Sequence, residues 1–411
     1  MKNNKQVGRY GMPIEVKYCI KCNTTNQQPT STNEYKHDKY TTQIPIEFDI
    51  NNVCHACKVV EEKWNGKIDW KEREKELIEL SKKYKNVKGP YNCIVGGSGG
   101  KDSSFQSHVL KYKYKMRPLT VTWTPHIYTE IGWKNFQNWI HKGGFDNYLF
   151  TPNPKIHRKI TREATLNILH PFQPFIMGQK TFALKVANMF NIPLIFYGEG
   201  GGKGGKKQLI NEKSFKDTKN QKGFEIDPLE GRKFKDAYLG GKQVQNYLDE
   251  GLTLNDLESY KPLDPEIISK KKLEFYYLSY FLRWTPQENY YYSVKHADFL
   301  ANTERTEGTY QKYASLDDKV DGFFFYTSYI KFGIGRAMLD SAYEIRHGHT
   351  TKEEGKALIQ KFDGEYPVKY EREFYEYISM NKDEFLELCD KFRPSHIWEK
   401  KSNQWVLKKP L

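Results

Sequence analysis

The chain has 411 residues and a formal net charge of +14. This length is enough for a large hydrophobic core with one or two smaller modules. No run of about 18 apolar residues occurs, and the polar N-terminus lacks the apolar segment of a signal peptide, so we expect a cytoplasmic protein without a membrane partner. The lysines are spread along the chain, which favours a solvated basic surface, suited to small anionic ligands, over a nucleic-acid interface.

The first four of six cysteines form two Cys-x-x-Cys pairs, at Cys19, Cys22, Cys54 and Cys57. Such pairs can supply four thiolates to a tetrahedral zinc ion, and disulfides are not expected in a cytosolic protein. The pairs are separated by residues 23–53, a longer spacer than usual, and a redox pair is the alternative. His37 and His55 lie nearby, but four cysteines complete a site, so we interpret both histidines as bystanders.

Residues 1–66 have little apolar periodicity, which predicts a small zinc-binding module that could not fold on its core alone. Residues 67–88 form a link that contains an amphipathic helix over 69–85. Strands then alternate with helices, which predicts an α/β domain with a parallel sheet over residues 89–240. The expected strands are 91–96, 117–123, 147–151 and 194–197, and the expected helices are 102–115, 131–142, 154–169 and 174–190.

Residues 241–411 are predicted to be a mostly helical region that serves the substrate or a partner. The segment 242–260 has a helical pattern, and 273–284 fits either a strand or a buried helix. Further helices are expected over 286–298, 315–346, 351–362, 371–379 and 381–392. Gly333 and Gly335 interrupt the aromatic pattern of the second of these; close helix packing explains them best, and close approach of a ligand is the alternative.

The most informative stretch is residues 91–104, with the sequence YNCIVGGSGGKDSS. An apolar run ends in glycines and an amphipathic segment follows, which is how α/β proteins place backbone N–H groups around a phosphate. The Gly-x4-Gly-Lys-Ser/Thr loop does not fit, because Val95 stands at its first glycine and Asp102 at its Ser/Thr. The order Ser-Gly-Gly-x-Asp-Ser over residues 98–103 instead resembles the PP-loop of ATP pyrophosphatases.

This resemblance implies that ATP is cleaved to AMP and pyrophosphate, with Mg²⁺ as the metal. Asp102 would contact Mg²⁺ or order the loop, and its alternative role is a helix cap. Lys101 would neutralise phosphate charge. Asp102, Lys101 and Ser98 are the catalytic residues expected on this basis. Ligands of such sheets bind beyond the carboxyl ends of the strands. The ATP-binding residues expected on this basis are Ser98, Gly99, Gly100, Lys101, Asp102, Ser103, Ser104, Val121, Thr122, Gly198 and Glu199.

Residues 200–225 are rich in glycine and lysine. Gly200, Gly202 and Gly205 formally satisfy G-x-G-x-x-G, but no apolar helix follows, so we predict a mobile loop or lid rather than a dinucleotide site.

Other stretches resemble one family within the PP-loop superfamily, the N-acetyl sugar amidotransferases. They are YCIKC at 18–22, FD at 48–49, CHAC at 54–57, YTEIGWKN at 128–135, HPFQPFIMGQK at 170–180, DDKVDGF at 317–323, IKFGIGR at 330–336, RHGH at 346–349, EEG at 353–355 and DGEYP at 363–367. The resemblance covers nearly the whole chain. It departs after Glu199, where glycines and lysines replace the Asn and Glu-Tyr-Gly element expected of the family.

The family resemblance implies an ATP-dependent ligase that converts the N-acetyl group of a sugar or nucleotide sugar to an acetamidino group through an O-adenylyl imidate. The products enter bacterial surface glycans, such as lipopolysaccharide O-antigen or flagellar glycans with acetamidino sugars of the pseudaminic acid type. The substrate residues expected are Gln173, Gln179, Lys180, Arg336, Arg346 and His349. His126 and His347 are further candidates, and helix caps or surface charges are the alternative for the whole set.

The nitrogen source is argued from the cysteines. An N-terminal-nucleophile glutaminase needs Cys at position 2, where this chain has Lys2, and neither Cys93 nor Cys389 stands on a strand–helix elbow. Ammonia is therefore expected from solution or from a separate glutaminase. Relatives in the family are associated with a glutaminase–synthase pair resembling that of histidine biosynthesis.

Two other functions share some of these features. A tRNA-modifying PP-loop enzyme, either a thiolase or a lysidine-type ligase, would have the same loop, zinc module and basic surface, but a thiolase needs additional catalytic cysteines. A non-enzymatic zinc-knuckle binding protein would not need an intact phosphate loop.

Overall fold

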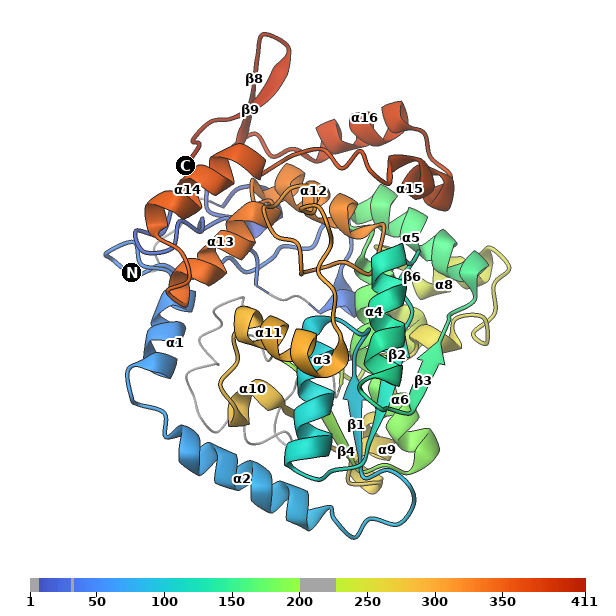
Figure 1. The fold of residues 1–411 in the computed structure, drawn as a ribbon. Coiled ribbons are helices and arrows are strands. Elements are labelled where there is room, and N and C mark those ends of the chain that lie inside the picture. Colours follow the sequence, from blue (N-terminus) through green and yellow to red (C-terminus); the bar gives the residue numbers. More distant parts are fainter. Residues whose placement is uncertain (1–6, 31–32, 200–226) are drawn as a thin grey trace, which may run out of the picture.

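The computed structural model describes residues 7–30, 33–199 and 227–411, and Figure 1 shows their arrangement. The predicted loop or lid at 200–225 lies outside these residues. None of the helices in the described ranges combines the length and apolar character needed to cross a membrane.

A parallel sheet forms the centre of the protein, as predicted. Its strand order is β3-β2-β1-β4-β7, and every neighbouring pair is parallel. The strands are β1 (Cys93–Gly96), β2 (Pro118–Trp123), β3 (Asn147–Phe150), β4 (Leu194–Tyr197) and β7 (Glu274–Tyr277). Because β1 is the central strand, the glycine loop that follows it leaves the middle of the sheet edge.

Both faces of the sheet are covered by helices, which explains the nearly continuous apolar runs of its strands. Ile94 belongs to the larger core cluster with residues of α6, whereas Cys93 and Val95 belong to a second cluster on the other face. The helices near the sheet are α2 (Trp70–Lys83), α3 (Lys101–His108), the π-helical turn η3 (Val109–Lys113), α4 (Glu130–His141), α5 (Pro154–Ile168), α6 (Gln173–Phe190) and α9 (Pro265–Lys270).

The segment at 273–284 contains both predicted alternatives: β7 is followed directly by the short helix α10 (Leu278–Phe281). The fifth strand therefore comes from beyond residue 240, and the sheet extends into the part of the chain assigned to the C-terminal region.

The helix predicted over 242–260 is wrong for most of its length. The chain makes a hairpin of β5 (Tyr238–Leu239) and β6 (Lys242–Gln243), then a short α8 (Val244–Asp249) and the 3-10 turn η6 (Glu258–Tyr260); the 3-10 turn η5 (Phe234–Asp236) precedes the hairpin. Helix α8 ends early at the turn around Gly251. Tyr247, near the end of this helix, packs into the core.

The C-terminal region is mostly helical, as predicted. Its helices are α11 (Pro286–Ala297), α12 (Asp321–Phe332), α13 (Arg336–Arg346), α14 (Lys352–Phe362), α15 (Glu371–Ile378) and α16 (Lys382–Phe392). The last five of these helices lie at one end of the molecule, whereas the first, α11, lies beside α3 (Figure 1). A hairpin of β8 (Trp398–Lys401) and β9 (Gln404–Leu407) follows, which the sequence analysis did not predict.

The single helix predicted over 315–346 is two helices. Gly333 ends α12 in the left-handed conformation, with φ of 65°, as glycine commonly does after a helix. Gly335 then precedes α13, and a Cβ atom there would lie 2.4 Å from Asp363 Oδ1. The glycines therefore form a helix break whose amides face a buried carboxylate: Gly335 N donates to Asp363 at 2.9 Å.

The N-terminal module has little core of its own. It contains the 3-10 turns η1 (Arg9–Gly11) and η2 (Glu34–Lys36) and the helix α1 (His55–Trp64). Its small apolar cluster surrounds the four cysteines and includes Ala342 of α13. Asn23 also donates to Lys352 O at 2.8 Å, so the module packs against the C-terminal region.

Candidate functional site

The glycine loop has the backbone that a phosphate-binding turn needs. Gly99 has φ of 86°, and a Cβ atom there would lie 2.6 Å from the Phe136 Cα atom. A side chain is therefore excluded at this position by conformation and by space. The loop continues directly into α3, whose N-cap Gly100 provides no side-chain cap, so the first amides of the helix have no partner within it.

Two side chains at the start of α3 form an ion pair. Lys101 Nζ lies 2.6 Å from Asp102 Oδ2, and the Lys101 side chain is 9% exposed. Helix α11 packs along α3 and secures both residues: Asn289 Nδ2 donates to Asp102 Oδ1 at 2.8 Å, and Ser293 Oγ donates to Lys101 O at 2.6 Å.

Sequence reasoning missed Asn289 and Ser293. Both are buried on an otherwise aromatic helix and stand four residues apart, so they share one face. A pair of polar residues at this spacing on a predicted buried face is the signal that could have found them.

The serines of the loop point to different neighbours. Ser98 forms a hydrogen bond with Asp317, whose pKa is raised by burial and lowered in part by that bond. Ser103 Oγ donates to Gly100 O at 2.9 Å, and the buried Ser104 hydroxyl has no partner in the described part of the chain.

The predicted nucleotide residues on the neighbouring strands are placed less favourably. Val121 is buried in the core of the sheet, and Thr122 Oγ1 accepts a hydrogen bond from Asn147 at 3.1 Å. Their side chains are therefore committed to the interior. Gly198 and Glu199 follow β4, and the Glu199 carboxylate accepts a hydrogen bond from Tyr343 OH at 3.0 Å. The pKa of Tyr343 is raised by burial and by the nearby carboxylates of Glu199 and Asp102.

A cavity of about 640 Å³ extends from Lys101 to the C-terminal helices and the N-terminal module. It is within the usual size range of ligand pockets. Lys101 is the predicted residue of the loop segment that lines it, together with five predicted substrate residues: Gln179, Lys180, Arg336, Arg346 and His349.

Gln173 and His126 do not line this cavity. Gln173 is fully buried; its amide nitrogen donates to Glu34 and its oxygen accepts from Gly240 N at 2.8 Å. His126 Nδ1 lies 2.7 Å from Asp318 Oδ2 in a buried pair. His347 is bonded to Tyr343 O, and burial lowers its pKa to about 4. These side chains were predicted as site residues from the sequence, but each makes a hydrogen bond within the protein, and in the described part of the chain only His126 Nε2 among their buried polar atoms lacks a partner.

Arg336 is the most constrained cation of the cavity wall. Its Nε donates to Asp340 Oδ2 at 2.8 Å, and its Nη1 donates to Ser315 Oγ at 2.6 Å. Nη1 also lies 3.7 Å from Asp321, whose pKa burial raises to about 7 although the guanidinium opposes the rise.

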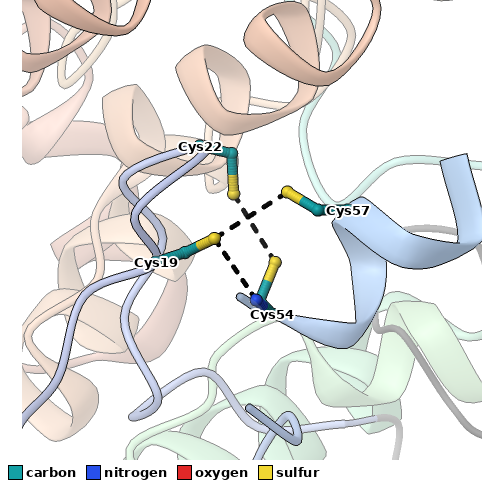
Figure 2. Close-up of side chains that lie close together, drawn as sticks. All are labelled: Cys19, Cys22, Cys54 and Cys57. Carbon is teal, nitrogen blue, oxygen red and sulfur yellow. Dashed lines mark hydrogen bonds between the residues drawn. The ribbon is translucent and has the colours of Figure 1, made fainter. Parts of the chain in front are cut away.

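The four cysteines of the paired motifs meet in one buried cluster (Figure 2). Cys19 and Cys57 sulfurs are 3.8 Å apart, and Cys22 and Cys54 sulfurs are 3.6 Å apart. Four thiolates at about 2.3 Å from one tetrahedral ion would be about 3.8 Å from each other, so the cluster fits a single metal ion. A cluster of several irons would hold the sulfurs farther apart.

Arg346 links this cluster to the cavity. Its Nη2 lies 3.3 Å from Cys22 Sγ and 3.9 Å from Cys54 Sγ, and the same side chain lines the cavity. A guanidinium beside thiolates offsets their negative charge. His55 lies outside the four-sulfur cluster and His37 lines the cavity, so neither is among the four candidate ligands.

Comparison with known proteins gives one family match. Residues 307–411 match the family described as LPS biosynthesis protein WbpG-like, C-terminal domain. No curated protein sequence matches the chain.

Several solved structures resemble parts of the chain. The NH3-dependent NAD synthetase from Campylobacter jejuni is 15% identical over 50% of this chain and 93% of that chain, with a TM-score of 0.27. An NMN synthetase from Francisella tularensis is 13% identical over 50% and 96%, with a TM-score of 0.23. The U34-tRNA thiolase NcsA from Methanococcus maripaludis, solved with its [4Fe-4S] cluster, is 13% identical over 81% and 86%, with a TM-score of 0.27. These similarities are too distant to support an argument about activity.

Helix α13, which carries Arg336, Tyr343 and Arg346, falls within the matched residues. Residues 307–411 are therefore similar to the WbpG-like C-terminal domain described for lipopolysaccharide biosynthesis proteins.

Proposed function

We propose that the protein is an ATP-dependent amidotransferase that converts the N-acetyl group of a sugar into an acetamidino group during bacterial surface glycan synthesis. The observation that carries the proposal is one cavity lined both by Lys101, which directly follows the glycine loop, and by Arg336 and Arg346 of α13 in the WbpG-like segment. ATP and the acceptor sugar could thus meet in one space.

The glycine loop would hold the β- and γ-phosphates of ATP. The amides at the start of α3 and the positive end of the helix favour an anion there. Lys101 would lie beside the phosphates, with Asn289 and Ser293 of α11 fixing the orientation of the ion pair. The Ser98 and Ser104 hydroxyls are further donors.

Asp102 and Glu199 are the carboxylates that would hold Mg²⁺. They follow the neighbouring strands β1 and β4, and both lie near Tyr343, since both raise its pKa. Carboxylate oxygens are the ligands that this ion prefers. When bound, Mg²⁺ would neutralise phosphate charge.

The proposed reaction has two steps. The acetamido oxygen attacks the α-phosphorus, the bond to pyrophosphate breaks, and an O-adenylyl imidate forms. Ammonia then attacks the imidate carbon, AMP leaves with the former amide oxygen, and one proton is lost to give the acetamidino group. The protein contributes mainly by positioning the reactants and by stabilising charge on phosphate.

The properties of the remaining cysteines support an external source of ammonia. Cys93 and Cys389 are both fully buried, and burial raises the pKa of the Cys93 thiol and raises that of Cys389 to about 12. Reactive cysteines have lowered pKa values and some exposure. We therefore propose that a separate glutaminase delivers ammonia.

We also propose that the four-cysteine cluster holds a structural zinc ion.

ATP–pyrophosphate exchange tests the proposal. Purified protein is incubated with Mg²⁺, ATP and labelled pyrophosphate, together with either UDP-linked N-acetyl sugars or bulk tRNA. Exchange that depends on a nucleotide sugar supports the proposal. Exchange that depends on tRNA instead would identify a tRNA-modifying PP-loop enzyme.

A further inference from the structure

One end of the cavity is built from polar residues that the proposed ATP site does not use. Glu34 and His37 come from the N-terminal module, His170 precedes α6, and Lys331 belongs to α12. All four line the cavity. Glu34 Oε2 lies 3.5 Å from His37 Nδ1, and the ring centroids of His37 and His170 are 6.2 Å apart, so these groups are close to one another.

Two imidazole nitrogens at this end have no hydrogen-bond partner in the described ranges: His37 Nδ1 and His170 Nδ1. His37 is only 5% exposed, and its Nδ1 lies 3.5 Å from Glu34 Oε2, which is longer than an ordinary N–H···O bond of about 3.2 Å or less. Leaving a buried polar atom unpaired is costly, so these nitrogens call for hydrogen-bonding groups from a ligand.

A group of stacked aromatic rings lies beside these polar groups. The rings of His170 and Phe324 are stacked with centroids 5.2 Å apart, and those of Phe172 and Phe324 are stacked at 5.3 Å. Both phenylalanines line the cavity. Aromatic rings next to hydrogen-bonding side chains suit a pyranose ring, which presents C–H groups on its face and hydroxyl groups at its edge.

The charges at this end favour a neutral ligand group over an anion. Burial opposes ionisation of Glu34, but its interactions with His37, His170 and Lys180 lower its pKa to about 2, so it is held as a carboxylate. The carboxylate would repel a phosphate, while it balances the charge of Lys180.

We propose that the end of the cavity formed by Glu34, His37, His170 and Phe324 binds the N-acetylated pyranose ring of the acceptor. This assignment rests on the proposed function. It also gives the N-terminal module a second role: besides holding the cysteine cluster, it supplies two of the residues that select the sugar.

The test measures sugar binding directly. Binding of N-acetylglucosamine, N-acetylgalactosamine and N-acetylmannosamine to the full chain is titrated by saturation-transfer NMR. His37→Phe and His170→Phe keep a ring but remove its nitrogens, and each is expected to weaken binding about threefold to tenfold, the loss of one net hydrogen bond. His141→Phe, at an exposed position of α4, is the matched control and should bind as the wild type does.

ATP binding is measured in the same samples and should be unchanged in all three variants. The assignment is overturned if none of the three sugars binds to the wild type, or if both variants bind them unaltered. If sugars bind and the variants weaken binding but acceptor-dependent exchange never occurs, the proposed reaction fails and the sugar site stands. If exchange occurs but the variants bind sugar normally, the reaction stands and the sugar site is wrong.

Discussion

Asn289 of α11 donates a 2.8 Å hydrogen bond to the carboxylate of Asp102, the acidic residue of the glycine loop. The two residues are far apart in sequence and come from different parts of the fold. Helix α11 therefore fixes the rotamer of the one loop carboxylate that we expect near the metal and the phosphates.

We predict that Asn289→Ala lowers kcat/KM for acceptor-dependent pyrophosphate exchange by about tenfold or more, because a hydrogen bond to a charged group contributes about 1.5–3 kcal/mol. Steady-state exchange kinetics check this. The control is Gln245→Ala, which also removes a side-chain amide. Gln245 lies on α8, donates to Asp249 and is remote from the loop, so the kinetics should be unchanged. Equal kinetics for Asn289→Ala and the wild type would show that α11 does not position Asp102.

The cysteine cluster predicts one zinc ion per chain, lost in Cys54→Ser. Since the module has little apolar core, loss of the metal should unfold it or lower its melting temperature markedly. Elemental analysis and thermal denaturation measure both effects. Cys389→Ala also removes a buried sulfur, but it should keep the metal. Purification of Cys54→Ser with a full equivalent of zinc would contradict the assignment.

Stability should depend on pH through Lys331. Burial lowers the pKa of this lysine from its ordinary value of 10.5 to about 7, so between these values the unfolded chain binds more protons than the folded one. Its contribution to stability is therefore complete above about pH 10.5 and is lost as the pH falls through about 7, with a slope of at most about 1.4 kcal/mol per pH unit.

Lys331→Met should flatten this part of the stability profile, which urea unfolding at pH 7, 8, 9 and 10 can measure. Lys361→Met, at an exposed position of α14, should leave the profile unchanged. A profile for Lys331→Met with the same slope as the wild type would mean that the lysine is not titrating in this range.

The sheet and its glycine loop could be predicted from the sequence because each depends on residues that are close together along the chain. Strands such as Cys93–Gly96 are apolar runs followed by turn residues, and the loop motif is contiguous. Gly333 was harder to interpret, because a glycine that ends a helix and one that allows close packing look alike until the neighbouring Asp363 is known.

The candidate site was predictable only in part, because burial and pairing depend on tertiary structure. Gln173 and His126 have the chemistry of site residues, yet the fold uses them internally. His37 was interpreted as a bystander of the cysteine site, but it directly follows the turn at Glu34–Lys36 and lies in the cavity wall. Nothing in the sequence joins that turn to Phe324.

The source of nitrogen gives another prediction. Since neither Cys93 nor Cys389 has the exposure or the lowered pKa of a glutaminase nucleophile, purified protein should form product with ammonium salts but not with glutamine. Adding a separate glutaminase should make glutamine a donor. Product formation is followed by mass spectrometry. Glutamine hydrolysis by the isolated protein at the rate of product formation would refute the partner requirement.

The most direct measurement of the central claim follows the amide oxygen. A nucleotide sugar whose N-acetyl carbonyl carries oxygen-18 is incubated with the protein, ATP, Mg²⁺ and ammonium, and the AMP is analysed by mass spectrometry. Attack of the amide oxygen on the α-phosphate predicts that AMP gains one oxygen-18 atom for each acetamidino group formed. Unlabelled AMP, or ADP and inorganic phosphate as the primary products, would contradict the account.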